Sequence, residues 1–434
     1  MKRSLVGCRL SLLPRLALAA LPLVLALLSP SAVVAQTVSD PVRPGIWRLD
    51  GMDPDLPLHD LEPLRQIVGS AQVVGLGETF HTSGGYYTMK HRVFRFLVQE
   101  MGFRAFAFES NWINAEQTAR YVATCEGTPE EGAAGLFGVW QSTETAELLK
   151  WMCEWNRSHP RRADKVHFFG FDIQQPEDDG PALIEFLLGQ GLEEDDPRIL
   201  GLRKCDGVES SVWPKPVPSS THRACVRALD QVDQLLKRLD PSDSVQPARA
   251  AVEWAKIHAL GLRAWEDEAY YEQRNGWRSY EARDRGMAHA FLRIRKLKVG
   301  AAKTAIWAHN SHIAKQSRLT FGGSTMGTFL EKPLRHNYVN IALTSVRPSI
   351  NWQALGRCGL VPPNNDSLER RLETLNLDYA LVDFDFPGAT EPFIPETNMW
   401  IGQRPNAPRR QYDGAIYLEE SPMMTPLRWP ATCP

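Results

Sequence analysis

The sequence lacks the short motifs that mark several common hydrolase and redox sites. It contains no G-x-S-x-G, S-x-x-K or H-E-x-x-H pattern, so a nucleophile-elbow serine hydrolase, a penicillin-binding type of site and a helical zinc protease are not supported. Without a C-x-x-C, a thioredoxin-type redox centre and a cysteine zinc ribbon are not supported either. Gly75-Leu76-Gly77 resembles the start of a dinucleotide loop, but Phe80 stands where the third glycine is required. Direct attack by activated water is therefore the simplest chemistry.

Long apolar runs are scarce as well. The one prominent run, Leu16 to Leu28, has 13 residues, whereas a bilayer span needs ~20. Four basic residues precede it and the small-residue segment Val33-Val34-Ala35 follows it, so residues 1–35 are predicted to be a cleaved export signal. We expect a periplasmic or secreted protein with no stable membrane span. Its 45 basic and 51 acidic side chains, a net charge of about −6, do not suggest a nucleic-acid partner.

Cysteine is infrequent but even in number in the mature chain. Cys8 lies in the predicted signal, and six cysteines remain, which in an oxidising compartment favours three disulfides. The alternative is that some of them are buried thiols. Pairing neighbours along the chain predicts Cys125–Cys153, Cys205–Cys225 and Cys358–Cys433.

Short apolar runs rich in strand-forming residues recur between segments of helical period. This alternation predicts an α/β fold with a mostly parallel sheet flanked by helices. Residues 36–434 are interpreted as one α/β domain, and the charged, helical stretch 179–299 as a helical insertion or cap within it. The predicted strands are Gln72–Leu76, Arg104–Phe108, Val166–Phe171, Thr304–Trp307, Tyr338–Leu343, Tyr379–Val382 and Ala415–Leu418.

Polar residues follow four of these strands, at the edge where a parallel sheet usually carries its active site. They are Glu78 and His81, Glu109, Asp172, and His309 with His312. A histidine takes a proton from water near neutral pH, and a carboxylate fixes its tautomer. Three basic residues, Lys90, Arg92 and Arg283, are candidates to bind substrate, to stabilise an oxyanion or to pair with the acids.

Each candidate also has a simpler interpretation. A carboxylate at a strand end, such as Asp172, is often a helix N-cap or an ion-pair partner. His309 and His312 are equally compatible with ordinary turn residues, and two residues spaced like Glu78 and His81 carry little information by themselves. The joint pattern is more informative than any member of it.

Several segments together resemble the erythromycin esterase family, in order and spacing, over about residues 60–420. The family enzymes open a macrolide lactone without a metal or other cofactor, and a histidine acts as general base. The resemblance implies that role for His81, with Glu78, Glu109, His309 and His312 completing the water-binding set. The segments are Gly77-Glu78-Thr79-Phe80-His81, Lys90-x-Arg92, Gly102 to Glu109, Gly170 to Gln174, Arg283-Asp284-x-x-Met287 and Trp307-Ala308-His309-Asn310-x-His312.

The chain departs from the family pattern at three places. Thr82 replaces the usual glycine after the loop histidine, Lys90 stands at a position usually occupied by arginine, and the segment from Ile341 to Cys358 diverges. We therefore expect an exported hydrolase of a small-molecule ester or lactone whose substrate differs from that of the family enzymes. Two alternatives stay open. One is a metal-dependent hydrolase or protease that uses the same histidines as ligands, and the other is a binding protein without catalysis.

Overall fold

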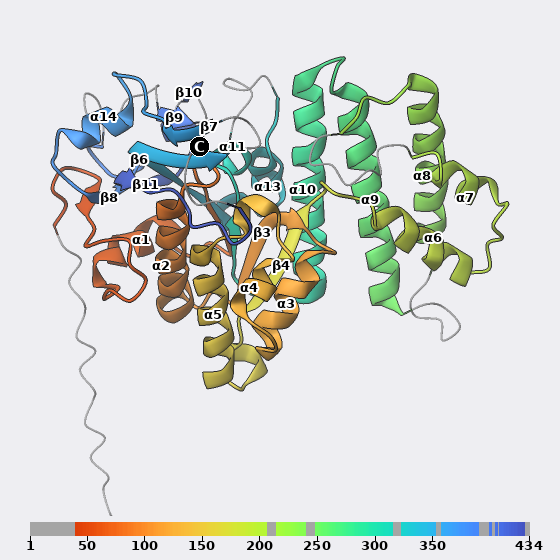
Figure 1. Cartoon of the computed structure of the whole chain (residues 1–434), viewed down its shortest axis with the longest axis horizontal. Coiled ribbons are helices and arrows are strands. Elements are labelled where there is room, and N and C mark those ends of the chain that lie inside the picture. The colour runs from red at the N-terminus through yellow and green to blue at the C-terminus, as the bar shows by residue number, and fades with distance from the viewer. Residues whose placement is uncertain are drawn as a thin grey trace, which may run out of the picture. The chain divides into compact units, whose positions relative to one another are not determined.

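The computed structural model describes residues 40–205, 214–239, 248–315, 323–352, 357–389, 399–401, 404–406 and 408–429 (Figure 1). The predicted export signal, residues 1–35, lies outside the described residues, and so does Cys433.

The centre of the fold is a mixed sheet, in which nine strands of the described residues follow the order β1-β8-β11-β6-β2-β5-β3-β4, with β7 paired to β6. Neighbours from β11 to β4 run parallel, whereas β8, β1 and β7 pair antiparallel. The mostly parallel sheet and all seven predicted strands are thus confirmed. The strands are β1 (Ile46–Arg48), β2 (Val73–Leu76), β3 (Ala105–Asn111), β4 (His167–Asp172), β5 (Thr304–Trp307), β6 (Tyr338–Trp352), β7 (Arg357–Leu360), β8 (Tyr379–Asp383) and β11 (Gly414–Ser421), with a separate hairpin of β9 (Met399–Ile401) and β10 (Arg404–Asn406).

Helices cover both faces of this sheet (Figure 1). Successive strand residues point to opposite faces, so Val74 and Leu76 join one apolar core while Val73 joins the other. The first core includes α1, α2 and α5, and the second includes α10 and α13. Helices and 3₁₀ turns outside residues 179–299 are η1 (His59–Leu61), α1 (Glu62–Val68), α2 (Gly84–Met101), α3 (Ala115–Thr124), α4 (Pro129–Ala133), η2 (Gly138–Trp140), α5 (Thr143–Ser158), η3 (Arg162–Asp164), α11 (Asn310–Ile313), α13 (Met326–Leu334), η4 (Arg335–Asn337), α14 (Leu368–Glu373) and α15 (Pro408–Gln411).

Residues 179–299 connect β4 to β5, and their described parts, 179–205, 214–239 and 248–299, lie mostly in helices. They form α6 (Asp179–Gly189), α7 (Pro197–Leu202), α8 (Ser219–Arg238), α9 (Arg249–Tyr271) and α10 (Gly276–Lys298). A third apolar core, separate from the two on the sheet, lies among α6, α7, α8 and α9 and contains Cys205 and Cys225. Within the described residues, no helix is both long enough and apolar enough to cross a membrane.

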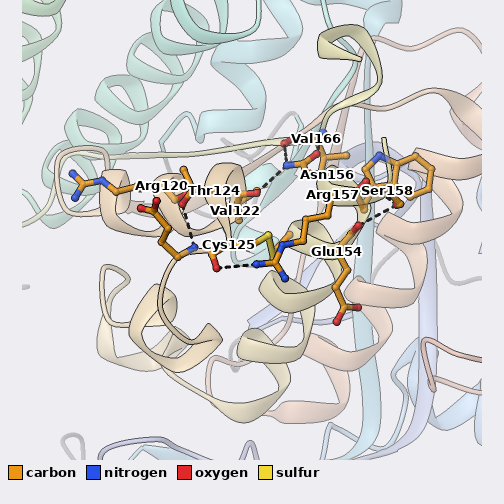
Figure 2. Close-up of a disulfide and its surroundings, with 12 residues drawn as sticks. Arg120, Val122, Thr124, Cys125, Glu154, Asn156, Arg157, Ser158 and Val166 are labelled. Carbon is orange, nitrogen blue, oxygen red and sulfur yellow. Dashed lines mark hydrogen bonds between the residues drawn. A yellow bond between two sulfur atoms is a disulfide. The ribbon is translucent and has the colours of Figure 1, made fainter. Parts of the chain in front are cut away.

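Two of the three predicted disulfides lie in the described residues, and both are present. Cys125 joins Cys153 with a Cα–Cα distance of 5.4 Å, and Cys205 joins Cys225 at 4.8 Å. Figure 2 shows the first bond, where Arg157 of α5 donates to the carbonyl oxygen of Cys125 at 3.3 Å. The disulfide therefore ties the end of α3 to α5. The predicted partner of Cys358, Cys433, lies outside the described residues.

Removing the bond between α3 and α5 should lower the free energy of unfolding. The two cysteines are 28 residues apart, and closing a loop of this size raises the free energy of the unfolded chain by about 3.5 kcal/mol. We expect the Cys125→Ser, Cys153→Ser double variant to lose that amount in urea denaturation. The matched control is the quadruple variant that also carries Cys205→Ser and Cys225→Ser. If the two disulfides act independently, its loss of stability should equal the sum of the losses of the two double variants. Unchanged stability without the first bond would contradict this role.

Candidate functional site

Four neighbouring parallel strands end at the same edge of the sheet and bring the predicted polar residues together. Glu78 follows β2 and His309 follows β5, while Glu109 lies near the end of β3 and Asp172 is the last residue of β4. Because β2, β5, β3 and β4 are adjacent in this order, their carboxyl ends meet. The predicted convergence of the four strand ends is therefore confirmed.

A close contact between two loops sets the local geometry at this edge. A Cβ atom on Gly77 would lie 1.9 Å from Oδ1 of Asn310, so a side chain at position 77 would force the two loops apart. Asn310 uses its amide to donate to the carbonyl oxygen of Leu343 at 2.8 Å and to accept from the amide nitrogen of Leu343 at 3.2 Å. The loop that carries His309 is thereby held between β2 and β6.

The first group of side chains surrounds the buried carboxylate of Glu78. One oxygen lies 2.7 Å from Nδ1 of His81, and the other accepts from the Lys90 ammonium at 2.5 Å. Lys90 is fully buried and lies 4.2 Å from the centre of the Trp307 ring. Burial lowers the pKa of Lys90 to about 8, although Glu78 acts in the opposite direction. Glu78 thus fixes the orientation of His81, and Lys90 balances its charge.

The second group centres on Arg283 of α10. Its guanidinium binds Asp172 at 2.6 Å and Glu109 at 3.0 Å. Glu109 also lies 3.3 Å from Nε2 of His312 and accepts from the backbone amide of His309 at 2.8 Å. Burial would raise the pKa of Glu109, but the positive charges of His312, His81 and Arg283 hold it well below its usual range. Glu109 is therefore ionised at neutral pH.

His312 lies between two carboxylates. Its Nδ1 donates to Asp284 at 2.6 Å, its Nε2 faces Glu109, and its ring stacks on Tyr280 with a centroid distance of 5.1 Å. Burial alone would lower the pKa of His312, but Asp284 and Glu109 raise it to about 10. His312 is consequently a fixed cation at neutral pH and is not placed to act as a base.

His309 is the opposite case. Its Nε2 donates to the carbonyl oxygen of Thr79 at 2.7 Å, and its Nδ1 accepts from the backbone amide of Ser311 at 3.1 Å. Burial, together with the charges of His81 and His312, lowers the pKa of His309 to about 3. The imidazole is therefore neutral, with both nitrogens occupied, and it holds the Thr79 loop in place.

The two groups meet at the His81 ring. It packs edge-on to Trp140 with a centroid distance of 4.7 Å and to His309 at 5.2 Å. Trp140 donates from its indole to the carbonyl oxygen of Glu109 at 2.7 Å. The side chain of His81 is 14% exposed, against 5% for His312. His81 is thus the more accessible of these two rings.

Arg92 does not belong to the site, which corrects the sequence-based prediction for it. Its guanidinium binds both oxygens of Asp60, at 2.6 and 2.9 Å, and the carbonyl oxygen of Gly51. Lys90 and Arg92 are two positions apart on α2, and a helix turns ~200° over two residues. The two side chains therefore leave the helix on opposite sides, and only Lys90 reaches the strand ends.

Several residues at the site were missed by sequence reasoning. Asp284, Tyr280, Ser311 and Trp140 each contact a site histidine or its support. Asp284 carried a usable signal, because it directly follows Arg283 in the segment that resembles the family. For Trp140, which reaches the site from the loop before α5, we find no signal in the sequence.

The described residues contain no cluster of three or more His, Cys, Asp or Glu side chains arranged to hold a metal ion.

The fold and the site together define an α/β protein with an acid–base cluster at the ends of its parallel strands. A family model described as "Erythromycin esterase" matches residues 98–421. The chain belongs to the erythromycin esterase family. Glu109, Asp172, Arg283, His309 and His312 lie inside the matched region, whereas the loop with Glu78 and His81 precedes it.

Individual relatives agree with this assignment at low identity. The chain is 24% identical to the putative hydrolase YbfO of Bacillus subtilis, covering 83% of this chain and 86% of the relative. It is 24% identical to erythromycin esterase type II of Escherichia coli, covering 76% and 85%.

Solved structures show the same fold. A Bacillus cereus protein has a TM-score of 0.73 at 22% identity and covers 88% of this chain and 97% of its own. A mutant of the erythromycin esterase EreC in its open conformation has a TM-score of 0.68 at 17% identity, covering 89% and 98%.

His312 and His309 should affect stability with opposite dependence on pH. The pKa of His312 is raised to about 10 from ~6.5 in the unfolded chain. Its stabilisation is complete below pH ~6.5 and is lost as the pH rises towards 10. We expect the stability difference between the natural protein and a His312→Gln variant to shrink over this range in urea denaturation. A difference that is constant from pH 6.5 to 10 would contradict the imidazolium assignment.

His309→Gln is the matched control. The pKa of His309 is lowered to about 3, so its contribution is present above pH ~6.5 and is lost as the pH falls. The stability difference from the natural protein should therefore shrink on the acid side. The same pH dependence of the stability difference in both variants would refute the assignment of opposite charge states to His312 and His309.

Breaking the ion pair of Arg92 should destabilise the fold. Arg92 is fully buried and Asp60 is 5% exposed, so Asp60→Asn leaves a buried charge uncompensated, at a cost of about 3–5 kcal/mol. Asp55→Asn is the control, because Asp55 pairs with Arg95 but is 88% exposed, and its loss should cost less than about 1 kcal/mol. Equal losses in urea denaturation would show that Arg92 does not need this partner.

Proposed function

We propose that the protein hydrolyses an ester or lactone of a small molecule by direct attack of water, with His81 as general base. The observation that carries the proposal is the contact of His81 with Glu78, whose carboxylate lies 2.7 Å from Nδ1 of a partly exposed ring. A carboxylate on one ring nitrogen orients the imidazole, and we assign the proton transfer to the other nitrogen, Nε2. His309 and His312 are bound through both ring nitrogens to groups of the loops and ion pairs, so we assign them supporting roles.

In the proposed reaction, a water oxygen attacks the carbonyl carbon while Nε2 of His81 accepts the proton. The Glu78 carboxylate orients the ring and stabilises the imidazolium that forms. The tetrahedral intermediate then collapses, the bond to the leaving oxygen breaks, and that oxygen takes the proton back from His81. The products are a carboxylic acid and an alcohol, and no covalent enzyme intermediate is required.

Stabilisation of the oxyanion is assigned to Arg283. Its Nε and Nη2 are bound by Asp172 and Glu109. Its Nη1 lies 3.5 Å from Nε2 of His312. When His312 is an imidazolium, both of these nitrogens are donors, so they do not bond to each other. The Nη1 donors are then oriented for a developing negative charge.

We also place the mature protein outside the cytoplasm. Support comes from the predicted signal at residues 1–35 and from the two disulfides, which form and persist in oxidising compartments. The relatives named as erythromycin esterases make macrolides the first substrate to test. A few altered contacts change selectivity by ~1–3 kcal/mol in an apolar pocket, so linear and cyclic esters belong in the same panel.

The test is turnover of this panel by the purified protein, followed by mass spectrometry for the gain of one water. His81→Gln should lower kcat by about 10²–10⁴-fold with a smaller change in KM, since general base catalysis acts in the transition state. His159→Gln is the matched control and should keep the natural rate, because His159 stacks on Trp155 away from the strand ends. Full activity of His81→Gln would refute the proposal.

The same assay separates the two alternatives. Loss of turnover with a chelator and recovery with added metal would favour a metal-dependent hydrolase or protease. Saturable binding of an ester without turnover, unchanged in His81→Gln, would favour a binding protein.

A further inference from the structure

One cavity of the described residues is lined by none of the side chains of the strand-end cluster. Its volume is about 600 Å³, within the ~300–1,000 Å³ range of small-molecule sites. The turn after β3 supplies Trp112, the residue before α6 supplies Asp178 and α6 itself Ala182. Helix α9 supplies Trp254 and His258, and α10 supplies Lys298. The cavity therefore lies where three helices of the 179–299 stretch meet the sheet.

An imidazole with a buried carboxylate behind it lines this cavity. Oδ1 of Asp179 accepts from Nδ1 of His258 at 2.6 Å and from the indole of Trp112 at 3.1 Å. With Nδ1 as the donor, Nε2 of His258 is left as an acceptor. Nε2 makes no hydrogen bond with the described residues, and the side chain is 12% exposed. The ring thus offers the cavity one oriented acceptor.

The carboxylate of Asp179 is not fully explained by a structural role. Asp179 has no exposed surface, and its Oδ2 has no hydrogen-bond partner among the described residues. Buried polar atoms without a partner are rare and costly. A carboxylate kept there at this cost is what an oriented imidazole requires.

The remaining walls favour a ring-shaped ligand. The Trp254 ring lies nearly parallel to that of His258, with a centroid distance of 6.0 Å and an angle of 28°. Together with Trp112, it gives the cavity two indole surfaces. Aromatic faces of this kind bind flat or ring-shaped apolar surfaces with little loss of conformational entropy.

The charges disfavour a ligand with a net charge. Asp178 and Glu116 on the lining would repel an anion. The Lys298 ammonium pairs with Glu116 and lies 5.6 Å from the centre of the Trp254 ring. A cationic ligand that stacked on the Trp254 ring would therefore be repelled by the Lys298 ammonium. Carboxylate and imidazole acceptors with aromatic faces match a neutral ring that carries hydroxyl donors.

We propose that this cavity is a binding site for a neutral polyhydroxylated ring of the sugar type, stacked on Trp254 and hydrogen-bonded through a hydroxyl to Nε2 of His258. The site is separate from the strand-end cluster and does not depend on the ester hydrolysis proposed above.

The test uses the mature protein and three probes, namely methyl glucoside, maltose and cellobiose, titrated by tryptophan fluorescence and ligand-observed NMR. At least one probe should bind saturably with a Kd of about 1 mM or tighter. His258→Gln and Trp254→Ala should each weaken binding about tenfold or more, because each removes one principal contact. His159→Gln is the matched control and should bind like the natural protein, as should His81→Gln.

Three results would overturn the proposal. They are no saturable binding of any of the three probes, equal affinity in His258→Gln, Trp254→Ala and the natural protein, or tighter binding of choline than of the sugars. Thermal denaturation of each variant shows that it is folded, so a loss of affinity in a folded His258→Gln protein reports on the site itself. If Trp254→Ala fails to fold, the affinity of His258→Gln for the probes is the test of the proposal.

Discussion

Glu109 accepts from three directions at once, namely the Arg283 guanidinium, the His312 ring and the backbone amide of His309. Removing an ion from water costs several kcal/mol, and the cost is balanced only when every partner is in place. Glu109 lies on β3, and its partners come from α10, the loop after β5 and α11. The sheet edge and the 179–299 helices must therefore dock together before any of these charges is stable. The cluster thereby couples the fold of the insertion to the geometry of the site.

The same electrostatic coupling gives two nearby histidines opposite charge states. Carboxylates on both sides keep His312 charged, whereas burial beside positive charge keeps His309 neutral. The third histidine, His81, is oriented by Glu78, whose other carboxylate oxygen binds Lys90. This division of roles follows from the partners of each ring and not from the residue type.

Hydrogen bonds account for one departure of this chain from the pattern of the erythromycin esterase family. Thr82, where the family usually has glycine, has a φ of 65°, a left-handed conformation that glycine adopts at little cost. Hydrogen bonds hold Thr82 there, because its amide donates to the Tyr87 hydroxyl at 2.7 Å and its hydroxyl accepts from the amide of Asn351 at 3.0 Å. Asn351 lies in the segment from Ile341 to Cys358 that diverges from the family. The two departures, 269 positions apart in the sequence, are therefore in contact in the folded chain.

The sequence by itself determined the strands, their mostly parallel order and two disulfide pairs, because periodicity and cysteine spacing are local properties of the chain. It also located Glu78, Glu109, Asp172 and His309, since residues that follow parallel strands must share one edge. Only the tertiary structure decided that His312 is charged and His309 neutral, because these states depend on burial and on partners from other elements of the fold, such as Glu109 and Asp284. It also showed that Lys90 belongs to the site and Arg92 does not. The two side chains leave α2 in opposite directions, and only the packing of that helix against the sheet decides which of them reaches the strand ends.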